Sequence, residues 1–148
     1  MPDKCLICDK ISKILKNDNP YFIAELETGY VVIGDSQYFK GYTLLLCKNH
    51  KTELHQLDKN FKLKFLKEMS EVAEAVHKAF KPVKLNYLIL GNSESHLHWH
   101  IFPRYKNDPI PKHPIWLLDR AIRFSVDALP TNEELTNLKR QLLDALKT

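Results

Sequence analysis

The order of apolar and polar positions along the chain predicts short strands and helices in alternation. Apolar residues at helical spacing over 8–16 predict a short first helix. Two β-rich runs, 21–25 and 30–33, flank a turn at 27–29 and together predict a hairpin. The nearly continuous apolar run 42–47 is typical of a strand that is buried on both faces.

A long helix and two further strands follow in the second half of the chain. From 58 to 81 the apolar residues recur every three or four positions, which predicts an amphipathic helix. The β-rich runs 85–90 and 96–104 predict two more strands, and a capping-box pattern at Thr131 opens a last helix. We therefore predict an α+β fold, in which an antiparallel sheet carries one long helix before its last two strands and a helical C-terminal end.

The composition is that of an ordinary globular domain and excludes several classes of protein. Of the 148 residues, 44% are hydrophobic and 27% charged, which predicts one compact domain over 1–148 and excludes a disordered chain. The net charge of +4 comes from scattered lysines, so no nucleic-acid partner is expected. No apolar run is long enough to predict a membrane span. An N-terminus without a secretory signal and an odd number of cysteines, 3, favour the reducing cytoplasm.

The run His96-Leu97-His98-Trp99-His100 carries the clearest chemical signal in the chain. Side chains alternate between the two faces of a strand, so the three histidines are predicted to project together from one face. Two functions fit three imidazoles in this arrangement. They can bind one zinc ion and leave a position open for water, or a neutral imidazole can attack phosphorus as a covalent nucleophile.

The segment 96–102 resembles the signature of the histidine triad (HIT) superfamily of nucleotide hydrolases and transferases, in which three histidines alternate with apolar residues. The strand 41–50 is similar to the upstream strand of that superfamily, and Pro103-Arg104 to the pair that often follows the triad. This variant of the motif is similar to bacterial members described as diadenosine-tetraphosphate hydrolase-like. The resemblance implies a HIT-like core over about 5–105. It does not include the C-terminal helical extension over about 106–148.

The resemblance implies a nucleotide substrate that is cleaved at its α-phosphate, at a phosphoanhydride or phosphoramidate bond. His98, the middle histidine, would be the nucleophile that forms a nucleotidyl-histidine intermediate, which water then hydrolyses. His100 would contact the phosphate oxygens. The other implied substrate-binding residues are Asn92, Ser93 and Ser95 around the phosphates and Asp35 on the ribose hydroxyls. Members of the superfamily are commonly homodimers, so a homodimer is expected here.

Two other functions stay open on this evidence. A zinc-water hydrolase would use His96, His98 and His100 as metal ligands, and a non-catalytic module would bind nucleotides without converting them. The chain also departs from the pattern of the superfamily. Tyr42 stands where many members have a histidine, and Cys47 where they have a proline, although neither position carries the nucleophile.

A cysteine pair near the N-terminus predicts half of a metal site. Cys5 and Cys8 have the spacing that lets two thiolates share one tetrahedral ion. The resemblance implies that His50 and His96 complete the set of ligands. Two cysteines and two histidines leave no open coordination position, so the expected cofactor is a structural zinc that fixes the N-terminal segment and the start of the histidine strand.

Overall fold

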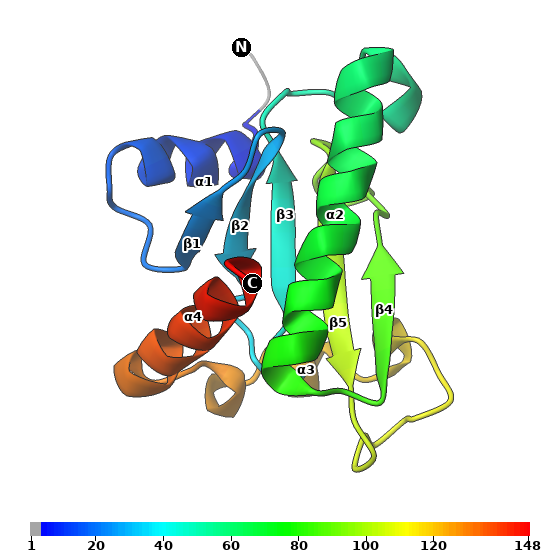
Figure 1. Cartoon of the computed structure of the whole chain (residues 1–148). Coiled ribbons are helices and arrows are strands. Elements are labelled where there is room, and N and C mark those ends of the chain that lie inside the picture. Colours follow the sequence, from blue (N-terminus) through cyan, green and yellow to red (C-terminus); the bar gives the residue numbers. More distant parts are fainter. Residues whose placement is uncertain (1–3) are drawn as a thin grey trace.

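The protein is described by a computed structural model that covers residues 4–148. In this part of the chain, one antiparallel sheet of five strands forms the centre of the fold, in the order β1-β2-β3-β5-β4 (Figure 1). The long helix is inserted between β3 and β4, as the apolar pattern predicts. The strands are β1 (Phe22–Glu25), β2 (Gly29–Ile33), β3 (Thr43–Cys47), β4 (Lys84–Leu88) and β5 (His98–Arg104).

Helices cover both faces of the sheet. The long helix α2 and the last helix α4 lie over one face (Figure 1), where they pack on the side chains of β2, β3 and β5 that point toward them. The first helix, α1, packs on the opposite face through the alternate residues of β2 and β3. The helices are α1 (Leu6–Leu15), α2 (Lys59–Phe80), α3 (Arg120–Arg123) and α4 (Asn132–Leu146), with 3-10 turns at Leu54–Gln56, Ile115–Leu117 and Val126–Ala128. None of the helices in residues 4–148 has the length and apolar character to cross a membrane.

The register between β3 and β5 decides which way the histidines point. Leu46 pairs with His98 and Leu44 with His100, so both histidines lie on the face that carries α1. Trp99 and the residues that alternate with the histidines belong to the main core beneath α2. The period-2 pattern of the histidine segment therefore separates a polar face from a buried one within the same strand.

Two predicted strand boundaries are wrong by two residues. The strand predicted over 85–90 ends at Leu88, and the start of the last strand is wrong for a local reason. The strand predicted over 96–104 begins only at His98, because His96 does not take part in the β-sheet hydrogen bonds of that strand. The His96 ring donates from Nε2 to the carbonyl of Cys47, 2.7 Å away, and Leu97 donates its backbone N–H to the carbonyl of Lys51. His96 consequently stands in the loop before β5 and does not continue the row formed by His98 and His100.

The C-terminal extension is integrated into the fold. Leu138 and Leu142 of α4 are buried in the same core as α2 and the sheet. The first part of the extension, 105–118, is held by Arg104, which is buried at the end of β5. The Arg104 guanidinium donates to both carboxylate oxygens of Asp108, to the Asn86 side chain and to two backbone carbonyls of the extension. The C-terminal segment therefore shares the main core with the sheet and α2.

Candidate active site and metal centre

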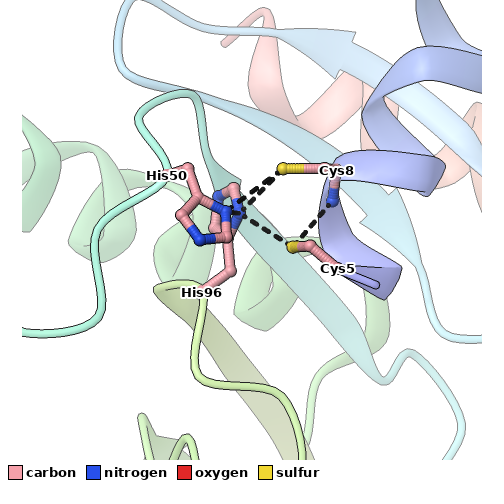
Figure 2. A group of neighbouring side chains, drawn as sticks. All are labelled: Cys5, Cys8, His50 and His96. Carbon is pink, nitrogen blue, oxygen red and sulfur yellow. Dashed lines mark hydrogen bonds between the residues drawn. The ribbon is translucent and has the colours of Figure 1, made fainter. Parts of the chain in front are cut away.

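Four side chains from three separate segments converge beside the N-terminus of α1 (Figure 2). Cys5 and Cys8 come from the start of that helix, His50 from the loop after β3, and His96 from the loop before β5. One ligand atom from each lies within 4.8 Å of all the others. The Sγ of Cys8 is 3.2 Å from Nδ1 of His50 and 3.5 Å from Nδ1 of His96, and the two Nδ1 atoms are 3.1 Å apart.

The chemistry and spacing of these four atoms fit a zinc ion. Zinc–sulfur bonds of about 2.3 Å and zinc–nitrogen bonds of about 2.0 Å give a tetrahedron with edges of roughly 3.3–3.8 Å. Three Sγ–Nδ1 separations in the cluster, 3.4, 3.2 and 3.5 Å, are close to these edges. Because Nε2 of His96 donates to the Cys47 carbonyl, its Nδ1 keeps a lone pair and faces the cysteines. Burial and the neighbouring Cys5 raise the pKa of Cys8 to about 11, so an incoming cation would displace the thiol proton.

The middle histidine of the triad is held in a single tautomer. Nδ1 of His98 lies 2.7 Å from the carbonyl oxygen of His96, which can only accept, so Nδ1 carries the proton. Its Nε2 then has a free lone pair. His98 lines a cavity of about 330 Å³, together with Ser95 and His55. Only His96 of the three triad histidines belongs to the Cys/His cluster, so the triad divides between this cluster and a second site.

The third histidine is oriented by the residue that replaces a histidine upstream. The hydroxyl of Tyr42 lies 2.6 Å from Nδ1 of His100. Burial raises the pKa of Tyr42 far above its ordinary value, so the hydroxyl keeps its proton. Burial, and then the positive charge on a protonated His98, lower the pKa of His100 to about 4. A neutral His100 that accepts from Tyr42 at Nδ1 carries its own proton at Nε2, ready to donate to an anion.

The other predicted substrate residues are only partly brought together. Asp35 is exposed at the end of β2 and lines a cavity of about 200 Å³ between α1 and the sheet, together with Lys10 and Tyr42. Ser95 lines the His98 cavity, as described above. Asn92 and Ser93 are exposed in the loop between β4 and β5, and the lining of that cavity does not include them.

Sequence reasoning misses some of the residues around the two histidines. His55 reads as an isolated histidine in the sequence, yet it lines the same cavity as His98. Lys10 lies on the polar side of α1, and its spacing alone does not indicate the cavity that it lines. Tyr42 did carry a signal, because it stands at a position where the upstream strand pattern has a histidine.

Comparisons with known proteins identify the family and the fold. The model of the HIT domain family matches residues 16–107. A curated relative, protein hit of Bacillus subtilis, is 29% identical over 109 residues, which are 70% of this chain and 72% of that protein. A histidine triad protein of Marinobacter aquaeolei superposes with a TM-score of 0.74 at 23% identity, over 85% of this chain and 88% of that one. A zinc-bound histidine triad family protein of Mycobacterium smegmatis gives a TM-score of 0.66 at 21% identity, over 97% and 94%. The chain belongs to the HIT domain family.

Proposed function

We propose that the protein is a nucleotide hydrolase or transferase that cleaves a phosphoanhydride or phosphoramidate bond at the α-phosphate of a dinucleoside polyphosphate-like substrate. The observation that carries this proposal is the bond from Nδ1 of His98 to the His96 carbonyl, which leaves the Nε2 lone pair free on a residue that lines a cavity. A nucleophile of this kind needs a fixed tautomer and access to the substrate. Family membership supports a nucleotide substrate.

The chemistry divides into two displacements at phosphorus. The Nε2 lone pair of His98 forms a P–N bond to the α-phosphate. The bond from phosphorus to the leaving group breaks, and the leaving group departs with the electron pair of that bond. Water then attacks the same phosphorus, which releases a nucleoside monophosphate and returns the electron pair to His98. Nε2–H of His100, held by Tyr42, donates to the phosphate oxygen on which charge develops. Ser95 and Asp35 would contact the phosphates and the ribose, with Asn92 and Ser93 reaching the phosphates if their loop closes.

We also propose a structural zinc bound by Cys5, Cys8, His50 and His96. A closed set of four ligands has no position for a reactive water, so its role would be to join three segments of the chain. Within the proposal this favours covalent catalysis over a zinc-water hydrolase. His96 serves both parts, because its ring faces the metal centre while its carbonyl accepts from His98.

A chemical trap tests the reaction. Wild-type protein is mixed with diadenosine tetraphosphate labelled in the adenosine, quenched in alkali and digested, and the label is located by mass spectrometry. The proposal expects labelled His98, and AMP release that falls by at least about a thousandfold in His98→Ala. The matched control is His77→Ala, an exposed histidine of α2, which is expected to leave the rate unchanged. Turnover without a labelled histidine supports the zinc-water hydrolase, and tight binding without product over hours supports the non-catalytic module.

A homodimer and a cytoplasmic location complete the proposal. The strand β4 lies at an edge of the sheet, and the flanking Val83 and Leu90 expose more than half of their surface, as an edge-to-edge dimer would require. Light scattering is expected to give twice the chain mass of 17.3 kDa, and the mass of a single chain would contradict the dimer.

The three cysteines, all in the described residues, form no disulfide, which supports a reducing compartment.

A further inference from the structure

His100 also lines a second pocket, and no residue of α1 contributes to the lining of this pocket. It has a volume of about 110 Å³ and lies between the strands of the HIT core and the C-terminal extension. The core contributes Tyr42, His100 and Phe102, and the extension contributes Arg123 and Phe124 from the end of α3. Aromatic side chains predominate in its lining, and one cation faces them. This composition is suited to a ligand that has both a flat ring and a negative charge.

The backbone that carries Arg123 is fixed to the core. Ser36 is the residue after Asp35, in the loop that follows β2. Its hydroxyl donates to the carbonyl of Arg123. Farther along, Gln37 donates its backbone N–H to the carbonyl of Ala128 at 2.7 Å. Apolar residues of the extension, Ile115 and Leu118, pack with Phe39 and Phe102. The pocket wall is thus held in place before any ligand binds, which lowers the entropy cost of binding.

Arg123 has no acidic partner in the described part of the chain. Arg104, the arginine of the Pro-Arg motif, is 4% exposed and donates to Asp108 and to other groups of the extension, so it is not free for a ligand. Arg123 makes no salt bridge with any residue in 4–148, and its Nε alone donates, at 3.4 Å, to the Leu118 carbonyl. The guanidinium groups of Arg120 and Arg123 lie 4.8 and 5.2 Å from the ring centre of Phe124, which is 51% exposed.

We propose that this pocket is the subsite for the leaving group of the substrate, and that Arg123 binds a phosphate of a leaving nucleotide whose base stacks on Phe124. The inference rests on the proposed function, because it places the α-phosphate at His98 and His100 and the retained ribose at Asp35. That ribose position belongs to a different cavity, between α1 and the sheet, and the two cavities meet at Tyr42, which lines both. The C-terminal extension, which the family match does not cover, thereby selects a nucleotide as leaving group.

Binding measurements on an inert chain test the subsite separately from catalysis. Calorimetry is carried out on His98→Ala, with and without Arg123→Ala, using diadenosine tetraphosphate and AMP. Both ligands share the retained nucleotide, and only the first has a leaving nucleotide. Removing a charge-assisted contact is expected to raise the Kd of diadenosine tetraphosphate about ten- to one-hundredfold and to leave that of AMP within about twofold. Arg123→Lys retains the charge and should give an intermediate value.

The control is Arg140→Ala in the same background, since Arg140 is an exposed arginine of α4 far along the chain from the pocket. It is expected to change neither Kd. An equal loss for both ligands would overturn the proposal, since the pocket would then hold the retained nucleotide, and no loss for either would overturn it too. Turnover by the wild type is measured in parallel. A selective loss of binding in a chain that shows no turnover would keep the subsite and refute only the proposed hydrolysis.

Discussion

At the scale of single residues, the hydroxyl of Tyr42 sets the tautomer of His100. It lies 2.6 Å from Nδ1 and stays protonated, so we infer that it fixes the Nε2 proton toward the substrate. We predict that Tyr42→Phe, which keeps the ring and removes only this bond, lowers kcat by about tenfold or more and leaves KM within about twofold. The measurement is steady-state release of AMP from diadenosine tetraphosphate.

Two further variants separate orientation from packing. Tyr42→His restores a hydrogen-bonding group at the position and is expected to recover part of the lost kcat. Tyr105→Phe removes a hydroxyl that donates to the carbonyl of Lys40 and that lines neither the His98 nor the His100 cavity, and it should leave kcat unchanged. If Tyr42→Phe raised KM and left kcat at the wild-type value, the hydroxyl would be binding substrate and the orienting role would be wrong.

The half-buried His100 predicts a loss of stability in acid. Its folded-state pKa of about 4 lies below the ordinary value of 6.5, so between these values the unfolded chain binds more protons than the folded one. The contribution of His100 is therefore complete above pH 6.5 and is lost as the pH falls toward 4, by up to about 1.4 kcal/mol per unit. Urea unfolding at pH 7 and pH 5 measures this. We expect His100→Gln to lose less stability on acidification than the wild type, and equal losses in both chains would contradict the assignment.

Residue roles could be predicted from the sequence only where the spacing defines the geometry. The alternation around His98 predicts which side chains share a face, because the period of a strand is fixed. The roles of His55 and Arg123 depend on how distant segments pack, so local spacing gives no signal for them. The phosphate role expected for Asn92 depends on a loop conformation, and the exposed loop leaves that residue outside the His98 cavity.

At the scale of elements, the order of strands and helices follows from periodicity, while the ends of elements depend on side-chain bonds. The long helix predicted over 58–81 extends over Lys59–Phe80, because its apolar stripe and the proline after it define both ends. The capping box predicted at Thr131 is present. The strand start predicted at His96 is wrong by two residues, since the bond from its ring to Cys47 has no counterpart in the local pattern.

The segment that follows β5 should depend on one buried ion pair. The side chains of Arg104 and Asp108 are only 5% and 1% exposed, and their shortest N–O distance is 2.6 Å. Hydrogen bonds from Arg104 hold the pKa of Asp108 below its ordinary value, so the carboxyl is charged. Arg104→Leu would leave that charge buried without a cation beside it, with the backbone N–H of Ile110 as its remaining donor. We predict a loss of about 3–5 kcal/mol in the free energy of unfolding.

Urea unfolding measures the loss, and limited proteolysis shows where the chain opens. Cleavage is expected within 105–118, because Arg104 also donates to the carbonyls of Ile110 and His113. The matched control is Glu71→Ala, which breaks the exposed pair with Lys67 on α2 and should cost less than about 1 kcal/mol. A loss in Arg104→Leu no larger than in this control would show that the pair does not hold the segment.

At the scale of the whole molecule, the proposed zinc would join segments that are far apart in sequence. Its four ligands lie at the start of α1, after β3 and before β5, so one ion would close long loops of the chain. We predict about one zinc per chain and a lower Tm after chelation. Metal analysis and thermal melts check this. The double variant Cys5→Ser with Cys8→Ser should bind no zinc, whereas Cys47→Ala, a buried cysteine outside the cluster, should keep it.

The last helix provides the test of whether the chain folds as one domain or as a HIT core with an appendage. Leu142 is fully buried where α4 packs on α2 and β1, inside the main core. Leu142→Ala would leave a cavity there, and we predict a loss of about 2–5 kcal/mol with a single cooperative unfolding transition. Leu63→Ala, on the exposed side of α2 at 57% exposure, removes the same atoms and should cost under about 1 kcal/mol. If Leu142→Ala split the unfolding curve into two transitions, residues 106–148 would be a separate unit, and Arg123 would lose the rigid support on which its proposed subsite depends.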